Sequence, residues 1–165
     1  MKALMAPIVI LLLITASNIT LAISNNPSSQ SITVEIVNIE KVPIVKCMLN
    51  GKEVYFVLDS GSEITLVHGP DAGKYGFTIK NGSSKSIVGA SGGYQSLHEA
   101  QSVELTIGQQ SLKTQFYATD LSVVVDFLSI STGFNISGIV GMDLMRRYGL
   151  EIDYSNQQLV LYPSI

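Results

Sequence analysis

The stretch Phe56–Val67, FVLDSGSEITLV, decides how the rest of the chain is interpreted. An apolar run ends at Asp59, and the sequence becomes apolar again only after several small or polar residues. A carboxylate that enters an apolar setting is costly unless it is paired, hydrogen-bonded or protonated. Gly61 permits a sharp turn beyond the acid, and the hydroxyls of Ser60 and Ser62 can hold neighbouring backbone groups. These residues predict a carboxylate positioned on a tight loop, with an ordinary Asp-Ser-Gly surface turn as the alternative.

A second stretch, Ser137–Leu144 (SGIVGMDL), places two branched apolar residues between glycines and runs directly into a predicted helix. Gly138 and Gly141 allow the backbone to pass close against another segment, while Ile139 and Val140 fill the space behind it. Taken alone, the pattern also fits a buried strand followed by the start of a helix. The aspartate loop and this stretch together, in this order, are much more specific than either one.

Short β-type runs separated by turn residues make up most of the chain from Ile32 onward. The clearest local signal is Asn50-Gly51, a dipeptide that favours a two-residue turn and predicts a hairpin between residues 43–49 and 52–58. One helix is expected, with Asp143 as its capping residue and Gly149 at its end. The other strands are expected at residues 32–39, 65–68, 77–80, 84–88, 95–107, 111–119, 150–154 and 158–162. The predicted fold class is therefore mainly β.

The N-terminal segment has the layout of a secretory signal peptide. Lys2 precedes an apolar run at residues 7–16, small residues follow, and no acidic residue occurs in this segment. We therefore expect a signal peptide at residues 1–24, a flexible leader at 25–31 and the folded domain at 32–165. The alternative is an uncleaved membrane anchor at residues 3–23. The signal peptide predicts an exported protein, periplasmic or secreted, whereas the anchor predicts an exported protein that stays attached to the membrane.

Composition argues against several classes of partner and site. The chain has 10 basic and 13 acidic residues, a net charge of −3, and no basic patch, so nucleic acid is not an expected partner. Cys47 is the only cysteine, which excludes an internal disulfide and predicts a buried structural thiol. The only histidines, His68 and His98, are far apart in the sequence. We therefore predict no metal site and no cofactor.

Together, the two stretches resemble the retropepsin-like aspartic proteases, whose hallmark is Asp-Thr/Ser-Gly after an apolar strand and, later, two apolar residues and a glycine before a short helix. The resemblance spans residues 42–163. It implies a closed, β-barrel-like single domain with one short C-terminal helix, in which Asp59 is catalytic. The residues that it implies as active-site support are Ser60, Gly61, Ser62, Ile139, Val140 and Gly141. Ser62 is a mild departure, because family members more often carry alanine there.

The implied chemistry needs two aspartates. Aspartic proteases use two carboxylates that share a proton, one activating a water and the other donating a hydrogen bond to the scissile carbonyl. The chain has one suitable triplet, because Asp71-Ala72-Gly73 lacks the hydroxyl. The resemblance therefore implies a homodimer in which each copy contributes Asp59. The apolar run at residues 123–128 contains Asp126 and has two interpretations. One is a buried acid, and the one that we favour is a loop or a strand edge on a surface used for dimer contact.

A glycine-rich stretch between two strand-like runs matches the position of the family's substrate-binding flap. It comprises Val88, Gly89, Ala90, Ser91, Gly92 and Gly93, and an ordinary turn is the alternative. The predicted function is an aspartic endopeptidase that hydrolyses a polypeptide bound in extended form, with its side chains in mostly apolar pockets. The alternatives are a catalytically inactive peptide-binding or scaffold module with the same fold, and a structural envelope β-domain.

Overall fold

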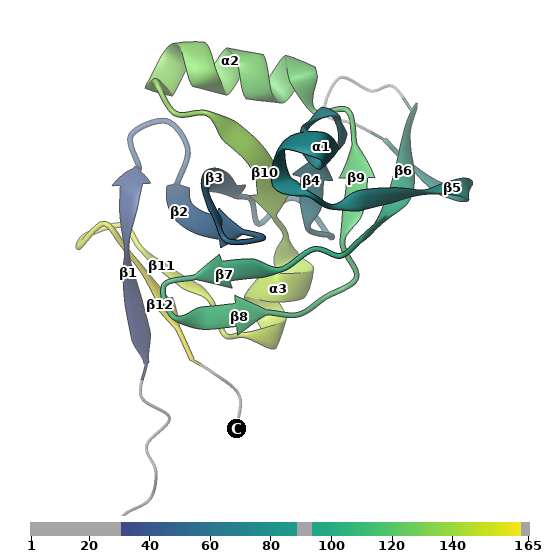
Figure 1. Cartoon of the computed structure of the whole chain (residues 1–165). Helices are drawn as coiled ribbons and strands as arrows, with labels where there is room; N and C mark the ends of the chain where they lie inside the picture. Colours follow the sequence, from purple (N-terminus) through teal and green to yellow (C-terminus); the bar gives the residue numbers. More distant parts are fainter. Residues whose placement is uncertain (1–30, 89–93, 163–165) are drawn as a thin grey trace, which may run out of the picture.

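The structure, a computed structural model, describes residues 31–88 and 94–162, and it is mainly β (Figure 1). Ten strands follow one another in a continuous sheet in the order β11-β12-β1-β2-β3-β10-β4-β9-β6-β5, and the β7–β8 hairpin attaches to β2. The strands are β1 (Ile32–Asn38), β2 (Ile44–Leu49), β3 (Lys52–Leu58), β4 (Leu66–His68), β5 (Thr78–Val88), β6 (Tyr94–Gln101), β7 (Leu105–Ile107), β8 (Gln110–Leu112), β9 (Tyr117–Thr119), β10 (Ile136–Val140), β11 (Glu151–Asp153) and β12 (Gln158–Leu161). The helices are η1 (Gly69–Asp71), α1 (Ala72–Tyr75), α2 (Ser122–Thr132) and α3 (Met142–Arg147).

The mainly β class is confirmed, but the sheet is open rather than closed into a barrel. Its ends are β11 and β5, which lie at opposite ends of the strand order and do not pair with each other. Two helices lie against this sheet: α2 lies across one end of β10, and α3 lies near the β7–β8 hairpin (Figure 1).

The hairpin at Asn50-Gly51 is confirmed. Strands β2 and β3 pair antiparallel from Ile44 opposite Val57 to Leu49 opposite Lys52. The φ angles of the two turn residues are 48° and 76°, both positive, as the two-residue turn requires. The second strand of this hairpin leads directly to Asp59.

Several predicted strand boundaries are wrong. The single strand expected at residues 95–107 is divided into β6 and β7, with Ser102 at a φ of 59° between them. The segment 111–119 likewise contains two strands, β8 and β9. Conversely, the two strands expected at 77–80 and 84–88 form the single strand β5, whose register with β6 shifts between Ile79 and Ser84. A local irregularity at Gly82, where φ is 114°, allows the strand to continue.

The expectation of a loop or a strand edge at residues 123–128 is also wrong, because this run belongs to helix α2. Its N-cap Leu121 and its residues Val125 and Leu128 are buried at helical spacing and belong to one hydrophobic cluster. The three consecutive valines favour a strand locally, so the burial of one helical face against β10 and its neighbours overrides that preference.

The predicted signal peptide and all of the leader except Ser31 lie outside the described residues. Within residues 31–88 and 94–162, no helix combines the length and apolar character needed to cross a bilayer.

Candidate active site

Asp59 lies immediately beyond strand β3, beside the strand that carries the second motif. Strand β10 runs parallel to β3, with Ile139 opposite Val57 and Val140 opposite Leu58. The Asp59 backbone N–H donates to the Val140 carbonyl at 3.0 Å. Two stretches that are far apart in the sequence are therefore adjacent in the fold, as their resemblance to one family implies.

The Asp59 carboxylate is held by its own loop. The Gly61 N–H donates to Asp59 Oδ1 at 2.8 Å, and the Ser62 N–H donates to the Asp59 carbonyl at 3.1 Å. The Ser62 hydroxyl donates to the Ile64 carbonyl at 2.8 Å and closes the other side of the turn. Asp59 is half-buried, whereas Ser60 and Gly61 are exposed. Hydrogen bonds at a fixed turn thus orient the carboxylate toward accessible space.

The glycines of the second motif allow the close approach that the sequence predicts. A Cβ atom at Gly138 would lie 2.1 Å from Cε1 of Phe56, and one at Gly141 would lie 2.4 Å from the Ile64 carbonyl oxygen. Neither separation is possible for real atoms without a shift of the neighbouring chain. Strand β3 and the aspartate loop therefore pack against backbone that carries no side chain.

A buried threonine joins the aspartate loop to helix α3. The Thr65 hydroxyl accepts from the Gly141 N–H at 3.1 Å and donates to Asp143 Oδ1 at 2.7 Å. The other Asp143 oxygen accepts from the Thr114 hydroxyl at 2.8 Å. The prediction that Asp143 caps α3 is wrong, because Gly141 occupies the capping position and Asp143 lies inside the helix. Sequence analysis missed Thr114, since no local pattern connects it to this helix.

A hollow of about 530 Å³ opens at Asp59 and Ser60. Its walls come from the β1–β2 connection, the end of β3, strand β10, helix α2 and the β11–β12 hairpin. Asp59 is its only charged lining residue among those described; the others are Val42, Pro43, Val57, Leu58, Val123, Val124, Phe127, Leu128, Ile139, Ile152 and Tyr154. The site is thus one oriented carboxylate in an otherwise apolar hollow of the size that small ligands and peptide side chains occupy.

A model of the aspartyl protease family matches residues 45–144, which include both motifs and every strand that positions them. The chain belongs to the aspartyl protease family. This membership supports a protease-type function, and it confirms the family that the two motifs indicate.

Two solved structures resemble this aspartyl protease. The crystal structure of a retropepsin-like aspartic protease from Rickettsia conorii is 19% identical, with a TM-score of 0.50, and the match covers 80% of this chain and 89% of that one. EIAV protease complexed with the inhibitor HBY-793 is 18% identical, with a TM-score of 0.47, and the match covers 66% and 89%. No curated protein matches the chain. The first likeness confirms a retropepsin-like fold.

The predicted flap is only partly described in this aspartyl protease. Val88 ends strand β5 and lies opposite Tyr94, the first residue of β6, so the two strands form an antiparallel hairpin. The other predicted flap residues, Gly89, Ala90, Ser91, Gly92 and Gly93, connect these strands and lie outside the described residues. A hairpin connection at this position is compatible with a flap, whose role stays a prediction.

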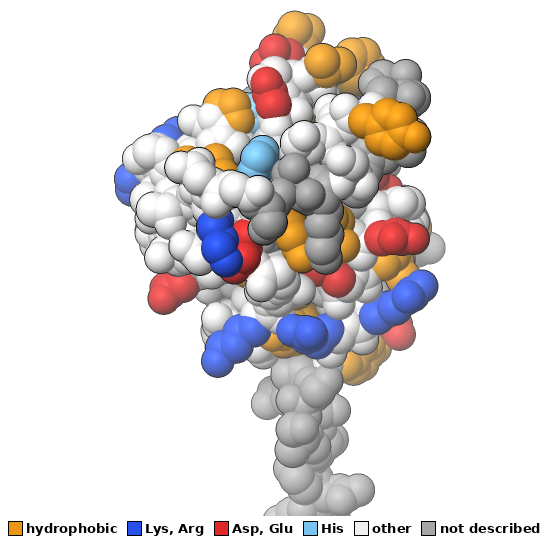
Figure 2. All heavy atoms as spheres, turned by 90° about the vertical axis from the view of Figure 1, so that its right-hand side faces the viewer, with side chains coloured by type: hydrophobic (Ala, Val, Ile, Leu, Met, Phe, Trp, Pro, Cys, Tyr) orange, Lys and Arg blue, Asp and Glu red, His pale blue; other side chains and the backbone are white. Residues whose placement is uncertain are grey.

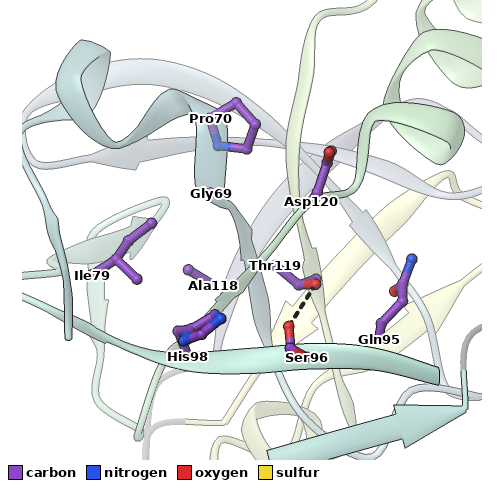
Figure 3. Close-up of a pocket in the computed structure, with 9 residues that line it drawn as sticks. All are labelled: Gly69, Pro70, Ile79, Gln95, Ser96, His98, Ala118, Thr119 and Asp120. Carbon is purple, nitrogen blue, oxygen red and sulfur yellow. Dashed lines mark hydrogen bonds between the residues drawn. The ribbon is translucent and has the colours of Figure 1, made fainter. Parts of the chain in front are cut away.

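A second hollow, of about 420 Å³, is lined by residues of η1, β5, β6 and β9 (Figure 3). The Thr119 hydroxyl donates to the Ser96 carbonyl at 3.1 Å across it, and the His98 ring lies along the same strand as Ser96. Asp120 also lines it, but its carboxylate accepts from the Ser122 N–H and hydroxyl at the start of α2. These hydrogen bonds lower the pKa of Asp120. This acid is therefore engaged in supporting a helix.

The two histidines lie at structural positions. Nδ1 of His68 accepts from the Leu121 N–H at 3.1 Å, so this buried ring holds the segment that leads into α2. His98 lies opposite Ala118 in the β6–β9 pair. Among residues 31–88 and 94–162, no group of three His, Cys, Asp or Glu side chains could hold a metal ion.

Proposed function

We propose that this chain is an aspartic endopeptidase whose active unit is a homodimer. One observation carries the proposal: Asp59 is oriented by its own turn at the floor of an apolar hollow, and no other described acid lines that hollow. Aspartic proteolysis needs two carboxylates a few ångströms apart. A second copy that brings its own Asp59 to the first would complete the pair, and a twofold axis beside Asp59 generates this arrangement.

The loop geometry suits a carboxylate that must accept and release a proton. The Gly61 N–H binds Oδ1 at 2.8 Å, and among the described residues no hydrogen bond to Oδ2 is found. In the dimer, one ionised Asp59 would take a proton from a bound water, whose oxygen attacks the scissile carbonyl carbon. The other Asp59, protonated, would hydrogen-bond to the carbonyl oxygen. Transfer of a proton to the amide nitrogen then breaks the C–N bond and leaves a free acid and a free amine.

An extended peptide would bind along the β5 edge of the sheet. Edge strand β5 offers backbone groups to a peptide that adds as a strand. Alternate side chains of such a peptide point in opposite directions, so every second one would face the hollow at Asp59. This arrangement supports cleavage within a chain rather than removal of a terminal residue.

Replacement of Asp59 tests the proposed catalysis. Asp59→Asn keeps the shape of the side chain and its bond from Gly61 but removes the ionisable group, so cleavage of a peptide library should be lost. The free energy of unfolding should change little, because the carboxylate is half-buried and open to solvent. Asp71→Asn is the matched control, since Asp71 begins the only other Asp-x-Gly triplet in the sequence and does not line the hollow.

Mixing subunits tests the dimer separately from the chemistry. If each active unit needs Asp59 from both copies, random pairing of equal amounts of wild type and the Asp59→Asn variant leaves about one quarter of the dimers active. An active monomer would instead retain about one half of the activity under the same mixing. A protein that sediments as a monomer, cleaves nothing and still binds peptides would instead be the inactive binding module of this fold.

We also propose that the protein is exported through residues 1–24. The charged start, the apolar run at residues 7–16 and the small residues that follow support this proposal. N-terminal sequencing of the protein recovered from its native host tests it. A mature chain that begins near residue 25 is expected, whereas recovery of the intact N-terminus in the membrane fraction would indicate an anchor.

A further inference from the structure

The second hollow, beside strands β6 and β9, is separate from the site at Asp59. None of its nine described lining residues lines the hollow at Asp59. His98 lies opposite Ala118 in the β6–β9 pair, so both side chains point to the same face of the sheet. Ala118 belongs to the larger hydrophobic cluster, whereas Leu97 and Tyr117, which precede these two residues, pack in the smaller one. The smaller cluster also supplies walls of the hollow at Asp59. The second hollow therefore opens on the opposite face of this strand pair.

Three polar side chains at the second hollow keep hydrogen-bonding atoms free for a ligand: Gln95, His98 and Asp120. Within residues 31–88 and 94–162, no hydrogen bond is found to the Gln95 amide, to the His98 ring or to Oδ2 of Asp120. Gln95 and His98 lie along β6, and Asp120 lies across the opening from them (Figure 3). A ligand in the hollow would therefore meet polar groups on two sides.

Apolar surface lies between these polar groups. Ile79 comes from β5, Pro70 from η1 and Ala118 from β9, and all three border the opening in Figure 3. The volume of about 420 Å³ is within the range of pockets that bind small ligands. The hollow thus offers an apolar bed that ends at a carboxylate.

The charge at the second hollow is negative. The Ser122 hydroxyl and N–H both donate to Oδ1 of Asp120 and lower the pKa of its carboxyl, so this group is ionised at neutral pH. No lysine or arginine is among the described lining residues, and Lys80, the neighbour of Ile79, pairs with Glu99 at 3.3 Å. Figure 2 shows this side of the molecule, where acidic side chains lie directly above a histidine. A cation is therefore favoured over an anion.

We propose that this hollow binds a lysine or arginine side chain of a polypeptide, with its cationic group at Asp120 and its aliphatic stem against Ile79 and Pro70. Lysine and arginine combine a long apolar stem with a charged end, which matches an apolar bed that ends at a carboxylate. The Gln95 amide both donates and accepts, so it would bind a peptide group of the same ligand. Binding here would leave the hollow at Asp59 open, because the two hollows lie on opposite faces of the sheet.

The experiment titrates the full-length protein with small probes and follows the backbone amides of Ser96 and Ala118 and the ring protons of His98 by nuclear magnetic resonance. The probes are Nα-acetyl-lysine N-methylamide, its arginine, norleucine and glutamate counterparts, and n-butylamine. The lysine and arginine probes should bind about two- to fivefold more tightly than the norleucine probe, the range of an exposed ion pair. This difference should shrink as salt is raised from about 0.01 to 1 M. n-Butylamine lacks the peptide groups and should bind about 2- to 10-fold more weakly than the lysine probe.

Three variants separate direct contact with Asp120 from its support of helix α2. Asp120→Asn should weaken binding of the lysine probe about two- to fivefold, to the level of the norleucine probe. Ser122→Ala removes a donor that supports the helix but keeps the carboxylate, so its affinity should equal that of wild type. Asp153→Asn is the matched control, because Asp153 is also an exposed aspartate whose Oδ1 accepts a nearby backbone N–H, from Asn156 at 2.9 Å, and it does not line the hollow. Its affinity should also be unchanged.

Each contrary outcome overturns a stated part of the proposal. Equal affinity for the lysine and norleucine probes would show that the charge of Asp120 is not used, and the cationic ligand would be wrong. Equal affinity for n-butylamine and the lysine probe would rule out recognition of a polypeptide. Equal losses in Asp120→Asn and Ser122→Ala would mean that the effect acts through α2. Absence of any change at Ser96, His98 and Ala118 up to the solubility limit of the probes would rule out the site.

Discussion

The Thr65 hydroxyl and the Asp143 carboxylate, 78 residues apart in the sequence, lie 2.7 Å apart in the fold. Thr65 is completely buried, and its oxygen also accepts the Gly141 N–H at 3.1 Å. One side chain thus links the end of the aspartate loop, the glycine that packs against that loop, and helix α3. Its replacement should disturb all three at once.

Thr65→Val should lower the free energy of unfolding by about 1–3 kcal/mol, because the new side chain fills the same space but leaves a buried N–H and a carboxylate oxygen without their partner. Urea unfolding followed by circular dichroism measures this loss as a lower midpoint at an unchanged slope. Thr65→Ser keeps the hydroxyl and should recover most of the stability. Equal stability of the Val variant and wild type would show that the three-way link contributes nothing.

The close packing at Gly138 leads to a second prediction. Gly138→Ala should destabilise the fold by about 1–3 kcal/mol or more, because its Cβ would lie 2.1 Å from a Phe56 ring carbon and 2.6 Å from the Leu66 carbonyl oxygen. Gly73→Ala is the matched control, since a Cβ there meets nothing within 4 Å and the residue belongs to a short helix. The control should be neutral or slightly stabilising, by up to about 1 kcal/mol. Thermal melting of the two variants compares them directly, and similar melting temperatures would contradict the packing argument.

Local chemistry made part of this structure predictable from sequence. Asn50 and Gly51 adopt the positive φ angles that a two-residue turn needs, and Gly149 has a φ of 53° after helix α3. The aspartate loop was also predictable, because a carboxylate after an apolar strand requires local hydrogen bonds, and Gly61 supplies one. These features depend on a few adjacent residues.

Helix α2 and the Thr114 contact were not predictable in this way. The triple valine in α2 favours a strand, and only burial of Val125 and Leu128 against distant strands makes the helix preferable. The Thr114 bond to Asp143 depends on how two segments 29 residues apart meet. Both features are decided by tertiary packing, which short sequence patterns do not contain.

Cys47 should be inert to thiol reagents while the protein is folded. The residue is 2% exposed, and burial raises the pKa of its thiol far above the usual range, so almost no thiolate forms near pH 8. Alkylation by iodoacetamide should proceed only as urea unfolds the chain, and its midpoint should coincide with that of circular dichroism. Lys46→Cys adds an exposed thiol on the same strand as a control, and this thiol should react at once. Rapid labelling of Cys47 in the native protein would mean that strand β2 opens locally.

Asp120 predicts how helix α2 responds to acid. The Ser122 hydroxyl and N–H both donate to its Oδ1, and they lower its pKa in the folded state. Because the folded pKa lies below the unfolded value of about 3.9, the stabilisation is present above that value and is lost as the pH falls through the folded pKa. The stability difference between wild type and Asp120→Asn should therefore be largest near neutral pH and shrink below about pH 4. Urea midpoints measured from pH 7 to strongly acidic pH test this trend.

Ser122→Ala removes one of the two donors to Asp120. The stability difference between Ser122→Ala and Asp120→Asn should therefore depend less on pH than the difference between wild type and Asp120→Asn. If the difference between wild type and Asp120→Asn is constant with pH, the charge of Asp120 does not support the helix.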